Sequence, residues 1–63
     1  MTLVVILNSG APIILENVTK AQFSTDVEDA YLDNKPSVKT YTEQSMGDIQ
    51  VNLLNVVHFR EWV

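Results

Sequence analysis

The residue types that most often carry out chemistry are sparse in this chain. The one histidine, His58, could serve as a general base, a metal ligand or a pH switch. Catalysis needs convergent partners, and no oriented carboxylate is evident near His58 in its apolar segment. We therefore expect His58 to be structural and the chain not to be an enzyme. The one alternative is an active site shared between subunits, with Tyr41, His58 and Arg60 supplied by different copies.

No phosphate-binding or metal-binding motif is present. The chain has two glycines and no cysteine, so it lacks both a glycine-rich phosphate cradle and thiolate ligands for zinc. Neighbouring carboxylates on a helix point in different directions and form no oxygen cage for calcium. We expect no cofactor and no metal. The carboxylates in question belong to Asp26, Glu28, Asp29 and Asp33.

The charge pattern gives a second hypothesis for function, a nucleic-acid-linked regulator. Four basic and eight acidic residues give a net charge of −4, and the basic ones are scattered. Phosphate backbones are normally bound by clustered basic stripes, so direct nucleic-acid binding is disfavoured. Direct binding would use Lys39, Tyr41 and Arg60 on an exposed sheet face. Alternatively, the acidic cluster around Tyr31 would imitate a run of phosphates, although a solvated helix face is its simpler interpretation.

The strongest structural pattern is an apolar hairpin at the start of the chain. Residues 3–7 read Leu-Val-Val-Ile-Leu and residues 13–15 read Ile-Ile-Leu, on either side of an Asn-Ser-Gly-Ala-Pro turn. Side chains alternate across a strand, so a hairpin with one solvent-exposed face should alternate apolar and polar residues. We therefore expect strands at residues 2–7 and 11–16 that are covered on both faces.

One amphipathic helix is predicted from about residue 20 to residue 33. Thr19 is suited to be its N-cap, Gln22 completes a capping box, and Val18 can pack on Phe23 as a hydrophobic staple. The helix should end before Pro36, near an asparagine that tolerates the left-handed cap conformation. The predicted buried face holds Phe23, Val27, Ala30 and Tyr31, and the acidic residues fall mainly elsewhere.

Alternating apolar and polar residues predict three further strands, at residues 38–43, 49–53 and 56–63. Asn52 and Asn55 flank Leu-Leu and mark a bend between the last two. The order is β-β-α-β-β-β, which predicts a single α+β domain over residues 1–63. We expect a small, mostly antiparallel sheet with one helix packed on one face.

Three segments resemble short uncharacterised proteins encoded by phages and prophages of Gram-positive bacteria. They are the strand-Asn-x-Gly-strand opening of residues 3–15, the capped helix, and Val-Asn-Leu-Leu-Asn-Val-Val at residues 51–57. The resemblance is one of pattern and size, and such proteins share no activity or catalytic residues. It implies an accessory or inhibitor protein that acts by binding a host protein.

These elements predict an assembly. Chains of this length bury only about 60% of their unfolded surface. The one predicted helix covers one face of the sheet, so the second face should meet a second copy or another protein. We expect a non-enzymatic interaction module that self-associates, with a dimer as the expected assembly, and binds a protein partner. With no apolar run of about 20 residues and no signal-peptide pattern, we expect no membrane association and a cytoplasmic location. The interface candidates are Leu3, Val5, Leu7, Ile14 and Trp62.

Overall fold

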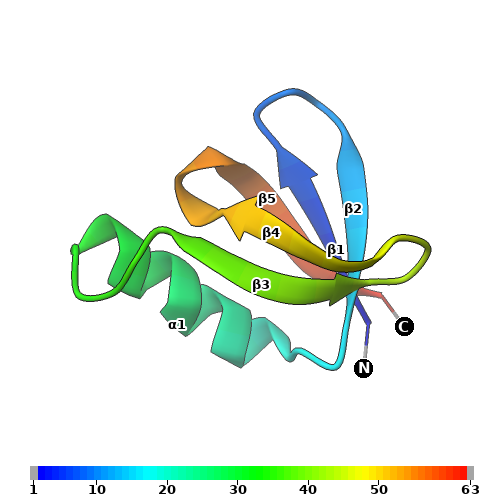
Figure 1. Cartoon of the computed structure of the whole chain (residues 1–63), viewed down its shortest axis with the longest axis horizontal. Helices are drawn as coiled ribbons and strands as arrows, with labels where there is room; N and C mark the ends of the chain where they lie inside the picture. The colour runs from blue at the N-terminus through cyan, green and yellow to red at the C-terminus, as the bar shows by residue number, and fades with distance from the viewer. Residues whose placement is uncertain (1, 63) are drawn as a thin grey trace.

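The chain folds as one antiparallel sheet with one helix. A computed structural model describes residues 2–62. The elements are β1 (Thr2–Leu7), β2 (Pro12–Glu16), α1 (Lys20–Tyr31), β3 (Val38–Glu43), β4 (Gly47–Asn52), the short 3-10 helix η1 (Leu53–Asn55) and β5 (Val56–Trp62). The strand order is β4-β3-β2-β1-β5 (Figure 1). The predicted α+β class and element order are confirmed, while Val63, included in the last predicted strand, lies outside the described residues.

The sheet is curled around one aromatic ring of the helix. Phe23 of α1 is fully buried, with its ring centroid 5.4 Å from that of Tyr41 on β3 and 4.9 Å from that of Phe59 on β5. The Tyr41 and Phe59 rings are therefore at most about 10 Å apart, whereas strands three positions apart in a flat sheet are separated by about 14 Å. Curling lets one short helix reach strands near both edges.

The first hairpin divides its apolar residues between two faces. The register pairs Leu3 with Leu15, and both side chains are fully buried in the core beside Val5. The intervening residues Val4 and Ile14 also pair with each other, and because side chains alternate they point to the opposite face. They are only half-buried, and we call this side of the sheet the open face.

Backbone and side-chain hydrogen bonds fix both ends of the helix. The hydroxyl of Thr19 accepts a bond from the backbone N–H of Gln22 at 3.1 Å, which confirms the predicted N-cap. At the other end Asp33 adopts a positive φ of 59°, and the N–H of Asn34 donates to the carbonyl of Asp29 at 2.9 Å. This is a Schellman cap, one residue earlier than the asparagine that the sequence suggested.

Two residues of the helix lie on the opposite side from the prediction. Tyr31, assigned to the buried face, is 61% exposed and only its hydroxyl reaches back, donating to the Leu54 carbonyl at 3.3 Å. Asp26, assigned to the solvated side, is 6% exposed. Asp26 is buried because it faces polar groups of β3 that donate hydrogen bonds to its carboxylate.

Candidate functional site and interaction surfaces

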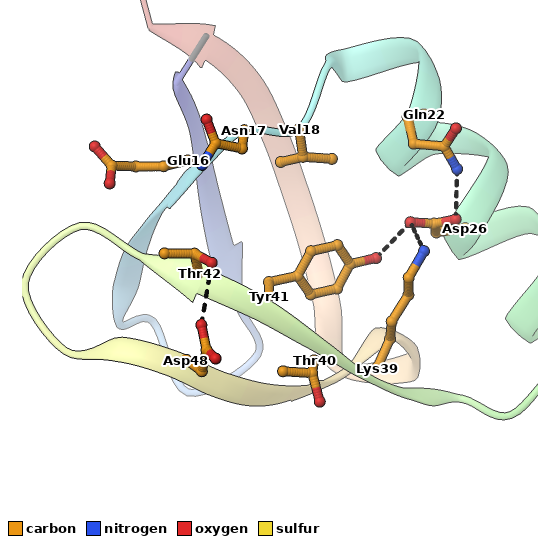
Figure 2. Close-up of a pocket in the computed structure, with 10 residues that line it drawn as sticks. All are labelled: Glu16, Asn17, Val18, Gln22, Asp26, Lys39, Thr40, Tyr41, Thr42 and Asp48. Carbon is orange, nitrogen blue, oxygen red and sulfur yellow. Dashed lines mark hydrogen bonds and ion pairs between the residues drawn. The ribbon is translucent and has the colours of Figure 1, made fainter.

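A buried cluster of polar side chains joins α1 to β3. The carboxylate of Asp26 accepts hydrogen bonds from the Tyr41 hydroxyl at 2.6 Å, the Lys39 ammonium at 2.8 Å and the Gln22 side-chain amide at 2.9 Å (Figure 2). Lys39 and Tyr41 are two residues apart on one strand, so they point to the same side of the sheet. Gln22 donates to Asp26 through its side-chain Nε2. Among the described residues no hydrogen bond runs from the Thr19 N–H to the Gln22 side-chain oxygen, so the predicted capping box is not completed.

The electrostatics of this cluster oppose acid-base chemistry near neutral pH. Burial raises the pKa of Asp26, but the bonds from Lys39, Tyr41 and Gln22 outweigh burial and leave that pKa below its ordinary value. Burial and the bond to Asp26 raise the pKa of Tyr41 far above its usual range. A general acid or base works best with a pKa near the operating pH. The cluster therefore acts as a fixed polar link between helix and strand.

Two cavities lie on either side of this link. The first, of about 410 Å³, extends toward the end of β2 and is lined by three carboxylates, those of Glu16, Asp26 and Asp48, against one ammonium, that of Lys39. The second, of about 420 Å³, extends toward the start of β3 and includes Val38. Both are lined by Asp26, Lys39 and Thr40, so together they form one groove along β3.

A second buried carboxylate, that of Glu43, closes the turn between β3 and β4. One of its oxygens accepts bonds from the backbone N–H groups of Ser45 and Met46 and from the Ser45 hydroxyl, at 2.7 to 2.9 Å. The other accepts from the Ile14 N–H at 3.1 Å. The bonds from Ser45, with those of Ile14 and Met46, lower the pKa of Glu43 to about 2. Glu43 therefore has a structural task.

The open face carries an apolar centre with a polar rim. In the register, Val4 of β1 lies between Ile14 of β2 and Arg60 of β5, and Ile6 lies between Pro12 and His58. The next row places Thr2 between Glu16 and Trp62, whose side chain is 55% exposed. We call these nine residues the open-face patch.

The predicted interface residues fall into two groups. Leu3 and Val5 are fully buried in the core and Leu7 packs against it, so none of the three lies on the open face. Ile14 and Trp62 belong to the open-face patch. The prediction missed the patch residues of the β1 apolar run, Val4 and Ile6, because an unbroken apolar run gives no sign of which alternate residues face the helix.

The residues assigned to direct nucleic-acid binding do not share a surface. Tyr41 is 7% exposed and bonded to Asp26, and Lys39 bonds the same carboxylate. Arg60 pairs with Val4 on the open face, on the other side of the sheet. His58 is exposed beside Ile6 on that same open face.

The described residues hold no group of three or more histidine, cysteine, aspartate or glutamate side chains placed to bind a metal ion. Among residues 2–62, no helix has the length and apolar character that crossing a membrane requires. No family model matches the chain, and no significant match was found among curated proteins or solved structures.

Proposed function

We propose that this chain is a small non-enzymatic interaction module that self-associates through the open-face patch and binds a protein partner. The observation that carries the proposal is the set of aliphatic residues Val4, Ile6 and Ile14 on adjacent strands, on the side opposite the core. Trp62 and Arg60 border them, and tryptophan and arginine are the residues most enriched at binding hot spots.

A second copy of the chain fits the charges of this patch. Glu16 of β2 and Arg60 of β5 lie on opposite sides of β1, one row apart. If two sheets pack face to face about a two-fold axis along the strands, β5 of one copy lies over β2 of the other. Arg60 then comes beside Glu16 of the second copy, and the symmetry forms this ion pair twice.

The size of the patch predicts weak association. Three adjacent strands span about 14 Å and five residues of strand about 17 Å, so the patch covers on the order of 240 Å² in projection. A standard interface buries about 800 Å² on each partner. Contacts limited to this patch should therefore give a dimer that dissociates on dilution.

The test is sedimentation velocity from micromolar to millimolar concentration, with two neighbouring lysine substitutions. Ile6→Lys places a charge on the open face and should leave a folded monomer at all concentrations. Val5→Lys places the charge in the core and should unfold the chain. A folded Ile6→Lys variant with unchanged association would refute the proposed interface, and so would a wild-type chain that stays monomeric at millimolar concentration.

A charge exchange tests the arrangement of the two copies. Arg60→Glu should weaken the dimer through repulsion by Glu16 of the second copy, and the double variant with Glu16→Arg should restore it. Both positions are on the surface, so folding should be unaffected, as far-ultraviolet circular dichroism can verify. Failure of the second substitution to restore association would rule out this two-fold packing.

A further inference from the structure

One edge of β3 is open along half of its length. In an antiparallel ladder, the backbone groups of successive residues point alternately to the two neighbouring strands. The N–H of Leu53 donates to the carbonyl of Ser37 at 2.8 Å, so odd-numbered residues of this strand bond toward β4. The N–H of Gln44 donates to the carbonyl of Ile14 at 2.9 Å, so even-numbered residues point toward β2.

The strand β2 ends too early to use all of these groups. Its pairing with β3 consists of Leu15 with Glu43 and Glu16 with Thr42. At Asn17 the backbone takes a positive φ of 60° and the chain turns away to begin α1 (Figure 1). The N–H and C=O groups of Val38 and Thr40 therefore point toward a side where none of the described strands pairs, and both residues are exposed.

The groove lies along this same open edge. Thr40 lines both cavities, and the ion pair between Lys39 and Asp26 lies where the two cavities join. Figure 2 shows the Lys39 and Tyr41 side chains reaching from β3 to Asp26, with Thr40 pointing the other way. Unpaired edge groups beside a groove are the arrangement by which sheet edges accept an extended peptide.

We propose that an extended segment of a protein partner adds to β3 as a strand, opposite residues 38–40. An antiparallel segment there continues the line of β2, with its first residue opposite Thr40 and its third opposite Val38. Both of these residues exchange backbone hydrogen bonds with β3, and both side chains point to the open face. The second residue points toward the helix, above Lys39 and Asp26.

Charge and polarity select the side chains of this segment. The first residue follows Glu16 by two positions on the same face, about 7 Å along the strand, and a lysine or arginine can bridge that distance. Asp48, opposite Thr42 in the register, adds a second carboxylate on that face. The third residue lies beside Val38, which is exposed, and Pro36 lines the cavity there. The expected sequence of the segment is therefore a basic residue, any residue, and an apolar residue.

This inference rests on the proposed function only in naming where the protein partner binds. The groove runs along β3 and the open-face patch lies on β2, β1 and β5, and Glu16 at the end of β2 belongs to both. A chain that never dimerises could still bind the segment, and a dimer could form without it, so the two proposals fail separately.

The first experiment titrates ¹⁵N-labelled protein with the peptide acetyl-Ser-Arg-Thr-Val-Ser-amide and follows backbone amide shifts by NMR. Saturable changes should centre on residues 38–41. Methylating the peptide nitrogen of Arg, which faces Thr40, should weaken binding by about tenfold. Methylating that of the central Thr, which points away from β3, should change affinity by less than about twofold. Replacing Arg by Glu should weaken binding more at low salt than at high salt.

A protein variant provides the matching test. The N–H of Thr40 points away from β4, so Thr40→Pro removes an edge donor without removing a bond of the β3–β4 ladder. This variant should stay folded and lose peptide binding, while Thr40→Val should bind as the wild type does. If Thr40→Pro unfolds the chain, the binding of the two methylated peptides to the wild-type protein is the test of the proposal. No saturable binding at millimolar peptide, equal weakening by both methyl groups, or shifts centred on the open-face patch would each overturn the proposal.

Discussion

Removing the Tyr41 hydroxyl should cost more stability than removing the Lys39 charge, although both groups bind the same oxygen of Asp26. Tyr41 and Asp26 are 7% and 6% exposed, so their bond forms out of water. A buried hydrogen bond to a charged group contributes about 1.5 to 3 kcal/mol. The Lys39 side chain is 47% exposed, and ion pairs open to water contribute about 0 to 1 kcal/mol.

The comparison uses Tyr41→Phe and Lys39→Met, which keep the ring and most of the aliphatic stem. Urea unfolding should show a loss of about 2 kcal/mol for the first variant and less than about 1 kcal/mol for the second. In a domain of this size, 2 kcal/mol lowers the unfolding temperature by roughly 15 °C. An equal or larger loss for Lys39→Met would refute the reasoning, because burial would not then decide the strength of these bonds.

Three further predictions concern stability. The pKa values of Glu43 and Asp26 are lowered by folding, so both carboxylates stabilise the fold above their ordinary pKa. Stability should therefore fall as the pH drops from 4.5, the ordinary value for Glu43, toward about 2, and urea midpoints measured across this range should fall less for Glu43→Gln than for the wild type. Phe23→Ala should cost about 3 kcal/mol or more, measured by urea unfolding, because the ring fills the centre of the curled sheet. Asn17→Ala should cost about 1 kcal/mol of stability because Asn17 has a positive φ, whereas Asn17→Gly should be nearly neutral. Equal unfolding temperatures for the two variants would contradict the expected backbone strain of alanine at this position.

Short-range patterns predicted the elements well. Thr19, Gln22 and Phe23 placed the helix start, because a cap and a staple are local interactions whose partners are within a few residues. Both hairpins follow from turn residues between apolar runs. The strand order was left open, because the last strand pairs with β1 across roughly 50 to 60 residues, from Leu7 with Val56 to Thr2 with Trp62. Such a pairing depends on how distant segments pack around the core, and local secondary-structure propensity carries no information about that packing.

The polar core was missed for a related reason. An aspartate on an amphipathic helix is usually solvated, and Asp26 was assigned accordingly. The available signal was a combination: a lysine and a tyrosine two residues apart on one strand, and an acid three residues after the buried Phe23. Only the packing of α1 against β3 turns these separate features into one set of hydrogen bonds. Tyr31 was misplaced in the opposite sense, because its position near the helix end carries it beyond the edge of the core.

The turn at Asn17 explains why this fold leaves part of the β3 edge unpaired. A longer β2 would pair with all of β3 and satisfy Val38 and Thr40, but the chain would then have no room to lead α1 back under the sheet. Ending β2 at Glu16 lets Val18 and Phe23 enter the core. It also leaves the β3 residues before Thr42 without a strand partner on the β2 side. Phe23 of the helix packs against Tyr41 and Phe59 in the core, while Val4, Ile6 and Ile14 of the opposite face stay only half-buried. Covering the core with so short a chain thus leaves two places open, the β3 edge and the open-face patch.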